Sequence, residues 1–352
     1  MKRQGHALSC PEETMMSHPT INPQKPTTQL TSSQDTGAVQ TQTHRPILVS
    51  GSHRSGSTWV GKVLSLAPNT GYIHEPFNIQ GCRDGICRAH FPHWFFYVTE
   101  DTASQYHQPL KDTLRWAYSL NAEIASIARP IDAARLVKDY SYFLRHRIRQ
   151  SRTIMKDPIA LFSAEWLHQT FDMDVVLIVR HPAAFVASLK VAGWTFPFAD
   201  LQQQQALLKQ ELAEFEAEIN EFAADPTQDI IAQGILLWRI FHAQIARLKD
   251  RHPDWIVSRH EDLSRAPDEA FGALYDRLGL DFSGISQVEF DKLVHARGSQ
   301  KSTARTPNQT QVFRDSKSNI YSWKQRLNEA EIARIKQAVT DISAQFYSDR
   351  DW

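Results

Sequence analysis

The chain has 352 residues, of which 41% are hydrophobic, so it can bury a sizeable core in one large α/β domain or at most two. Its 39 lysines and arginines balance 39 aspartates and glutamates, and this neutrality argues against a generic binder of nucleic acid or of anionic membranes. No stretch approaches the ~18 consecutive apolar residues of a membrane helix, so we expect no transmembrane span.

Residues 1–43 are rich in Gln, Thr, Ser and Pro and have almost no apolar periodicity, which predicts a disordered N-terminal tail. This segment also lacks the apolar core of a signal peptide. The three cysteines, Cys10, Cys82 and Cys87, are too few for a disulfide framework, although Cys82 and Cys87 could bridge a short loop. We therefore expect a cytoplasmic protein with one folded domain at residues 44–352.

A glycine-containing segment, GSHRSGST, follows the first apolar run. It places Gly51 and Gly56 five positions apart and Thr58 two positions later, the spacing of a phosphate-binding loop. In such a loop, backbone N–H groups and the start of the next helix surround an anion. Nucleotide triphosphatases carry a lysine after the second glycine, but Ser57 stands there and the loop's cation is Arg54. The pattern favours a different phosphate ligand, with a capped strand-to-helix turn as the alternative.

A second apolar run, VVLIV, ends at Arg180, and Ser188 follows on a predicted helix. An arginine at the end of a buried strand and a serine on the next helix can converge on one phosphate. Phosphate-loop NTPases hold Mg²⁺ through an acidic residue at the end of the corresponding strand. Because arginine stands there, the pattern predicts a metal-independent site. Each residue alone would also suit a surface ion pair or an ordinary helix hydroxyl.

The alternation of predicted strands and helices indicates a P-loop-type three-layer α/β fold, with a central parallel sheet flanked by helices. We expect helical insertions at about residues 77–150 and 192–227, with a solvated helix at residues 201–224 in the second. The predicted strands are residues 46–50, 71–74, 152–156, 175–180 and 255–259, and the predicted helices are residues 57–66, 161–170, 183–191 and 228–250.

The candidate site residues lie at the carboxyl ends of four different predicted strands. Ligand loops of parallel α/β sheets lie at the carboxyl ends of the strands. The loop at residues 51–58, Glu75, Lys156 and Arg180 all fall at such ends. The sequence therefore predicts that they meet in one cleft.

Three segments resemble the family of sulfotransferases that use 3′-phosphoadenosine 5′-phosphosulfate (PAPS). RSGSTW at residues 54–59 matches the phosphate loop of that family position by position. Arg180 and Ser188 have the spacing of the pair with which the family holds the 3′-phosphate. Residues 255–281 are similar to the late strand and helix of these enzymes.

The resemblance extends over residues 46–334 and is closest to the carbohydrate and bacterial branch, because of YIHEPF at residues 72–77 and KDP at residues 156–158. It implies transfer of a sulfuryl group from PAPS, without a metal, to a hydroxyl or amine of a carbohydrate, glycolipid or small metabolite. A P-loop kinase or NTPase, and a non-catalytic protein that binds the desulfated product PAP, are the alternatives. The oligomeric state stays open.

The resemblance also implies roles for individual residues. Glu75 is the candidate general base, with Asp157 as the alternative. Because side chains alternate along a strand, we expect His74 to point to the opposite face. Lys156 and Arg54 are expected to stabilise the leaving phosphate. The residues expected to bind PAPS are Arg54, Ser55, Gly56, Ser57, Thr58, Trp59 (beside the adenine), Arg180 and Ser188.

Acceptor recognition is expected from the insertions. The aromatic-rich segments FPHWFFY and GWTFPF offer Trp94 and Trp194 as platforms for sugar rings or an apolar group, with packing of a lid as the alternative. The small-molecule branch closes an Arg-Lys-Gly triplet over the 3′-phosphate, which this chain lacks. Arg314 or Lys317 could replace it, or could be ordinary loop charges.

Overall fold

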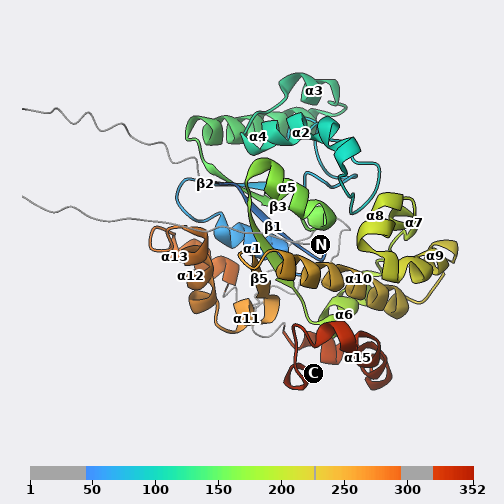
Figure 1. Cartoon of the computed structure of the whole chain (residues 1–352). Helices are drawn as coiled ribbons and strands as arrows, with labels where there is room; N and C mark the ends of the chain where they lie inside the picture. The colour runs from blue at the N-terminus through green and yellow to red at the C-terminus, as the bar shows by residue number, and fades with distance from the viewer. Residues whose placement is uncertain (1–44, 226, 295–319) are drawn as a thin grey trace, which may run out of the picture. The chain divides into compact units, whose positions relative to one another are not determined.

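The computed structural model describes residues 45–225, 227–294 and 320–352 (Figure 1). These residues lie in one unit, His44–Trp352, and the predicted tail at residues 1–43 lies outside them. None of the helices in the described ranges is both long and apolar enough to cross a membrane.

The strands of the described ranges form one parallel sheet of five, in the order β2-β3-β1-β4-β5, and all five strands predicted from the sequence are present. β1 is central, because Ile47 pairs with Ile154 of β3 on one side and with Asp174 of β4 on the other. Every residue of β1 is buried, which explains its continuous apolar run. The strands are β1 Ile47–Gly51, β2 Thr70–His74, β3 Arg152–Lys156, β4 Asp174–Val179 and β5 Ile256–Arg259.

Alternate residues of β1 face two apolar clusters, one on each side of the sheet. Ile47 and Val49 pack with side chains of α1, α12 and α13, whereas Leu48 packs with side chains of α5, α6 and α10. This arrangement confirms the predicted three-layer α/β fold (Figure 1). The helices are α1 Ser57–Leu64, α12 Pro267–Leu278, α13 Gln287–Val294, α5 Ala164–Phe171, α6 Pro182–Ala192 and α10 Ile230–Arg251.

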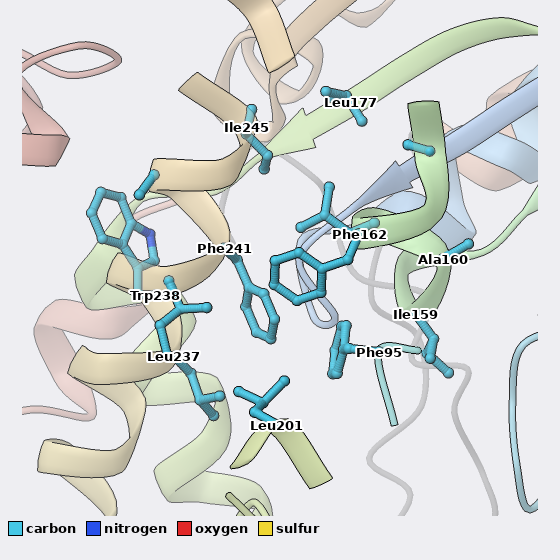
Figure 2. Packing of buried hydrophobic residues seen from close by; sticks show 14 of the residues in the cluster. Phe95, Ile159, Ala160, Phe162, Leu177, Leu201, Leu237, Trp238, Phe241 and Ile245 are labelled. Carbon is cyan, nitrogen blue, oxygen red and sulfur yellow. The ribbon is translucent and has the colours of Figure 1, made fainter. Parts of the chain in front are cut away.

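Phe241 of α10 lies in the middle of the cluster that contains Leu48 (Figure 2). Its ring lies 4.5 Å from that of Phe95 and 6.1 Å from that of Phe162, centroid to centroid. Phe162 belongs to the short 3-10 helix η1 (Pro158–Ser163), and Phe95 belongs to the first insertion. The core therefore fixes this part of the insertion against the sheet.

The first insertion contributes three helices at the β2 edge of the sheet (Figure 1). Ile73 of β2 forms a small apolar cluster with Trp116 and Phe143. The indole N–H of Trp116 donates to the carbonyl oxygen of Ser151, at a distance of 2.9 Å, just before β3. The helices are α2 Glu100–Leu114, α3 Leu120–Ala125 and α4 Pro130–Ile148.

The prediction of one solvated helix at residues 201–224 is wrong. The segment contains three short α-helices and one 3-10 helix, and Leu201, Leu208 and Phe215 are buried in the cluster around Phe241. The many Gln and Glu residues obscured the spacing of these apolar side chains. The elements are α7 Ala199–Gln202, α8 Gln205–Glu211, η2 Ala213–Phe215 and α9 Glu216–Ala224, and α11 His260–Arg265, η3 Ser322–Gln325, α15 Glu329–Ser343 and η4 Asp349–Asp351 follow later.

Candidate active site

The phosphate loop, residues 51–58, connects β1 to α1 with three residues at positive φ. Gly51 has a φ of +128°, and a Cβ atom there would lie 2.3 Å from the carbonyl oxygen of Ile178 in β4. Gly56 has a φ of +95°. Arg54 has a φ of +63°, a conformation that is unfavourable for a residue with a side chain and that clusters at functional sites. The loop therefore approaches the sheet as only glycine allows.

Several polar groups of the loop have no hydrogen-bond partner within the described ranges. α1 begins at Ser57 with Gly56 as its N-cap, and no side chain of the described ranges caps it. The first N–H groups of the helix, including those of Ser57 and Thr58, therefore have no intrahelical acceptor. The hydroxyls of Ser52 and Ser55 are buried without a hydrogen-bond partner among the described residues. Because unsatisfied buried donors are costly, this segment is suited to bind an anion.

Two arginines from distant segments, Arg180 and Arg326, lie near Arg54 of this loop. Arg54 donates from Nε to the hydroxyl of Ser188, at 2.8 Å. Arg180 is only 9% exposed and donates from Nη1 to the backbone carbonyl oxygen of Arg54. Its Nε has no partner in the part of the chain that the structure describes. Arg326, which follows η3, lies near enough to influence the other two arginines electrostatically.

The environment of these guanidinium groups is electropositive. Burial lowers the pKa of Arg180 to about 10. The charge of Glu261 raises this pKa, whereas the charges of Arg54 and Arg326 lower it further. Burial and then the charge of Arg326 also lower the pKa of Arg54. A phosphate among them would relieve the repulsion. No motif pointed to Arg326, and Arg314 and Lys317 lie outside the described residues.

Glu75 and Lys156 form an ion pair at the ends of β2 and β3. Lys156 is 1% exposed and Glu75 is 16% exposed. The backbone N–H of Glu75 donates to the carbonyl oxygen of Lys156, at 2.9 Å, and the amide of Asn78 donates to the carboxylate, at 2.8 Å. Burial raises the pKa of Glu75, but Lys156, His74 and Asn78 outweigh it and hold the pKa below its ordinary value. The carboxylate is therefore ionised at neutral pH.

The expectation that His74 points away from Glu75 is wrong. Glu75 has a φ of +46°, so the extended conformation ends after His74 and side chains no longer alternate between the two faces of the sheet. As a result, the Nε2 of His74 lies 3.7 Å from the carboxylate of Glu75. The other ring nitrogen of His74 is 3.0 Å from the hydroxyl oxygen of Tyr72.

Asp157 is completely buried and holds backbone groups in place. One carboxylate oxygen accepts the N–H of Phe77, at 2.7 Å, and the other accepts the N–H of Ile159, at 3.0 Å, which caps η1. Burial, and then the charge of Glu75, raise the pKa of Asp157 to about 8 against these hydrogen bonds. Asp157 thus ties the segment after β2 to the end of β3.

Trp59 packs on the α1 side of the sheet. Its ring lies 5.1 Å from that of Phe271 and 5.4 Å from that of His260, and its Nε1 donates to the carbonyl oxygen of Leu293, at 3.0 Å. These contacts fix the start of α1. The predicted contact of Trp59 with adenine stays a prediction.

His53, which no motif singles out, contacts both insertions from the phosphate loop. Its ring lies 5.6 Å from Phe95 in the first insertion and 4.7 Å from Trp194 in the second, and Phe185 and Phe241 complete the cage. Burial, then the charge of Arg54, lower its pKa to about 3, so the imidazole is neutral. Trp194 remains 41% exposed, which leaves a ring surface open beside the loop.

Cys82 and Cys87 are free thiols and form no bridge. The described residues also contain no group of three or more His, Cys, Asp or Glu side chains that could hold a metal ion.

A profile of the sulfotransferase family matches residues 46–284, which include the phosphate loop, Glu75, Lys156, Arg180 and Ser188. The chain belongs to the sulfotransferase family. The family predicted from the sequence is thereby confirmed.

Solved structures similar to this sulfotransferase are themselves sulfotransferases. The sulfotransferase domain from the curacin biosynthetic pathway has 14% identity and a TM-score of 0.42, with 84% of this chain and 98% of that chain covered. The enzyme from Alicyclobacillus acidocaldarius has 14% identity and a TM-score of 0.38, with coverages of 87% and 97%. A mouse sulfotransferase complexed with PAP has 11% identity and a TM-score of 0.40, with coverages of 88% and 86%. No curated protein matches this sulfotransferase.

Proposed function

We propose that this sulfotransferase transfers the sulfuryl group of PAPS to a hydroxyl or amine of a carbohydrate, a glycolipid or a small metabolite. The observation that carries the proposal is the group of arginines at the phosphate loop, with Arg54 bonded to Ser188 and Arg180 bonded to the Arg54 carbonyl. A donor with phosphates at both its 5′ and 3′ positions fits two adjacent electropositive sites. The motif with which the family binds PAPS is present at both.

The two phosphates are assigned to two sets of groups. The 5′-phosphosulfate is held by the unpaired N–H groups at the start of α1, by the loop hydroxyls and by Arg54. The 3′-phosphate is held by Arg180 and Ser188, and Arg326 adds its charge from the C-terminal segment. Trp59 lines the adenine side.

The chemistry is an in-line displacement at sulfur. The acceptor oxygen or nitrogen forms a bond to sulfur while the bond from sulfur to the bridging phosphate oxygen breaks, and its electron pair stays on the phosphate. Lys156 and Arg54 stabilise this developing negative charge. The acceptor proton passes to the carboxylate of Glu75.

The ion pair of Lys156 and Glu75 couples the two halves of this reaction. While Lys156 contacts Glu75, the carboxylate is a weak base with a lowered pKa. When the ammonium group turns to the leaving phosphate, Glu75 loses that stabilisation and becomes a stronger base as the proton must be taken up. Glu75 is favoured over Asp157 because both oxygens of Asp157 already accept backbone N–H groups in a fully buried site.

The acceptor is expected beside His53 and Trp194. The exposed ring of Trp194 lies next to the phosphate loop, and the charge of Glu75 reaches His53. An acceptor with a sugar ring or an apolar group can stack on the indole and present its hydroxyl to Glu75.

Radiolabelled sulfate transfer from PAPS to a panel of sugars, glycolipids and small hydroxyl and amino compounds tests the proposal. Transfer to at least one acceptor class, slowed by about 10²–10⁴-fold in Glu75→Gln, is the expected result. Tight binding of PAP with no transfer to any acceptor would assign the chain to a non-catalytic role. Mg²⁺-dependent ATP hydrolysis by the purified protein would instead support the NTPase alternative.

A further inference from the structure

α4 carries large aliphatic side chains on its outward face. Val137 is 64% exposed, Leu144 is 40% exposed and Ile148 is 73% exposed. These positions are spaced by seven and four residues, so at about 100° per residue they form one stripe along the helix. We call these three residues the α4 stripe.

The packing of the other side of α4 fixes the orientation of the helix. Phe143 and His146 are buried, with their rings 5.3 Å and 4.7 Å from that of Trp116. The hydroxyl of Tyr142 accepts the backbone N–H of Tyr72 in β2, at 2.9 Å, and donates to its carbonyl oxygen, at 3.2 Å. The helix therefore has two apolar faces, and the α4 stripe cannot turn inward without breaking these contacts.

Basic residues flank the α4 stripe. Lys138 and Arg145 lie roughly 80–100° to one side of it, and Arg147 lies about as far to the other. Asp132 and Asp139, the acidic residues of the helix, are already paired with other arginines. Neither Lys138 nor Arg147 pairs with a carboxylate in the described part of the chain. An anionic surface complements this pattern.

We propose that α4 lies in the interfacial plane of an anionic lipid surface, with the α4 stripe among the acyl chains and the flanking basic residues at the headgroups. A helix with an aliphatic stripe that has Lys and Arg on both sides is a pattern that binds in this plane. The whole chain has a formal net charge of zero, so the attraction is local to this helix.

The same pattern disfavours a protein partner on this face. In a symmetric dimer, the basic rows of two copies of α4 would approach each other. Protein interfaces concentrate their binding energy in aromatic anchors that fill pockets, whereas the α4 stripe is a convex line of aliphatic side chains. The charge and the shape both fit a lipid surface better.

Flotation of the full chain with lipid vesicles tests this proposal independently of catalysis. We expect binding to vesicles that contain phosphatidylserine, no binding to pure phosphatidylcholine vesicles, and loss of binding at high salt. Val137→Ser, Leu144→Ser and Ile148→Ser in combination should abolish flotation. Val288→Ser is the matched control, because Val288 is 63% exposed on α13.

A charge variant separates the contribution of the flanking basic residues from that of the α4 stripe. Lys138→Gln with Arg147→Gln should weaken binding roughly tenfold or more, since each basic residue near an anionic surface strengthens binding about fivefold. Lys249→Gln on α10 should change nothing. Urea unfolding of each variant must match that of the wild type. Failure of the wild type to float with either vesicle, or equal loss in Val288→Ser, would overturn the proposal. A dimer in light scattering that the stripe variant dissociates would assign the face to a second copy.

Discussion

Lys156 and Glu75, at the ends of adjacent strands β3 and β2, form an ion pair beside the phosphate loop. Lys156 is almost completely buried, and its partner is one of only two carboxylates that follow these strands directly. The other, Asp157, uses both its oxygens on backbone N–H groups. The pair therefore joins the proposed base to the proposed contact of the leaving group, and the predictions below separate their contributions.

Replacing Arg180 tests the assignment of the 3′-phosphate. Loss of a buried, charge-assisted contact costs about 1.5–3 kcal/mol, so Arg180→Ala should weaken PAP binding by roughly ten- to a hundredfold in calorimetry. AMP lacks the 3′-phosphate, and its affinity should change little. The exposed Arg265 provides the control variant Arg265→Ala, which should bind PAP like the wild type. Equal affinity of the wild type for PAP and AMP would contradict the assignment.

Replacing Glu75 tests the general base. Glu75→Gln keeps the shape of the side chain but cannot take up the acceptor proton, so turnover should fall by about 10²–10⁴-fold while PAP affinity changes little. Arg54→Ala should weaken PAPS and slow transfer together, because its charge acts on both the bound donor and the developing phosphate charge. Near-normal turnover in Glu75→Gln would move the base to Asp157 or to the substrate itself.

The pH dependence of turnover should report the ion pair. If Glu75 is the base, the rate should fall on the acid side as Glu75 becomes protonated, and Lys156 holds that pKa below its ordinary value. In Lys156→Met, the pKa of Glu75 rises, so the acid limb of the pH–rate profile should move to higher pH and the maximum rate should also fall. Lys62→Met is the control, because Lys62 lies near Lys156 without being a partner of Glu75. An unchanged acid limb in Lys156→Met would mean that the group whose protonation limits the rate is not Glu75 paired with Lys156.

Trp194 should affect the acceptor and leave the donor unaffected. Removing the indole in Trp194→Ala takes away its exposed ring beside His53, so KM for the acceptor should rise about tenfold or more, in line with ~1.5 kcal/mol for one aromatic contact. Trp194→Phe should recover much of this loss, and calorimetry should show PAP affinity unchanged in both. A rise in the Kd of PAP in Trp194→Ala would show that the ring orders the phosphate loop.

Gly51 should be sensitive to a single methyl group. In Gly51→Ala, the new Cβ would meet the carbonyl oxygen of Ile178 at 2.3 Å in a left-handed conformation, so urea unfolding should show a loss of about 3 kcal/mol or more. Gly193→Ala shares the positive φ but has no atom within 4 Å of the new Cβ, and it should cost only about 1–2 kcal/mol. Equal losses would mean that backbone conformation, and not the contact with β4, dominates at Gly51.

The sheet and the phosphate loop were predictable because their signals are local. A buried parallel strand is often a continuous apolar run, and Arg180 directly follows such a run, VVLIV at residues 175–179. The direction of His74 was not predictable, because it depends on the positive φ of Glu75, which no residue type in that segment requires.

The cage around His53 and the position of Arg326 depend on contacts over long sequence distances. Phe95 and Phe241 meet His53 from positions far along the chain, and only the packed core places them there. The aromatic-rich segments that contain Phe95 and Trp194 were visible in the sequence, but their common meeting point was not. Arg326 stands in a short C-terminal turn without any motif.

The meeting of the two insertions at His53 also bears on how such an enzyme diversifies. The groups that we propose to hold the donor come from strand ends and α6, whereas the open ring beside them comes from segments outside the sheet. Mutations in those segments can change which compound is sulfated without disturbing the apparatus for the donor. We therefore expect that exchange of residues 193–198 between homologous enzymes redirects acceptor choice and leaves donor binding unchanged.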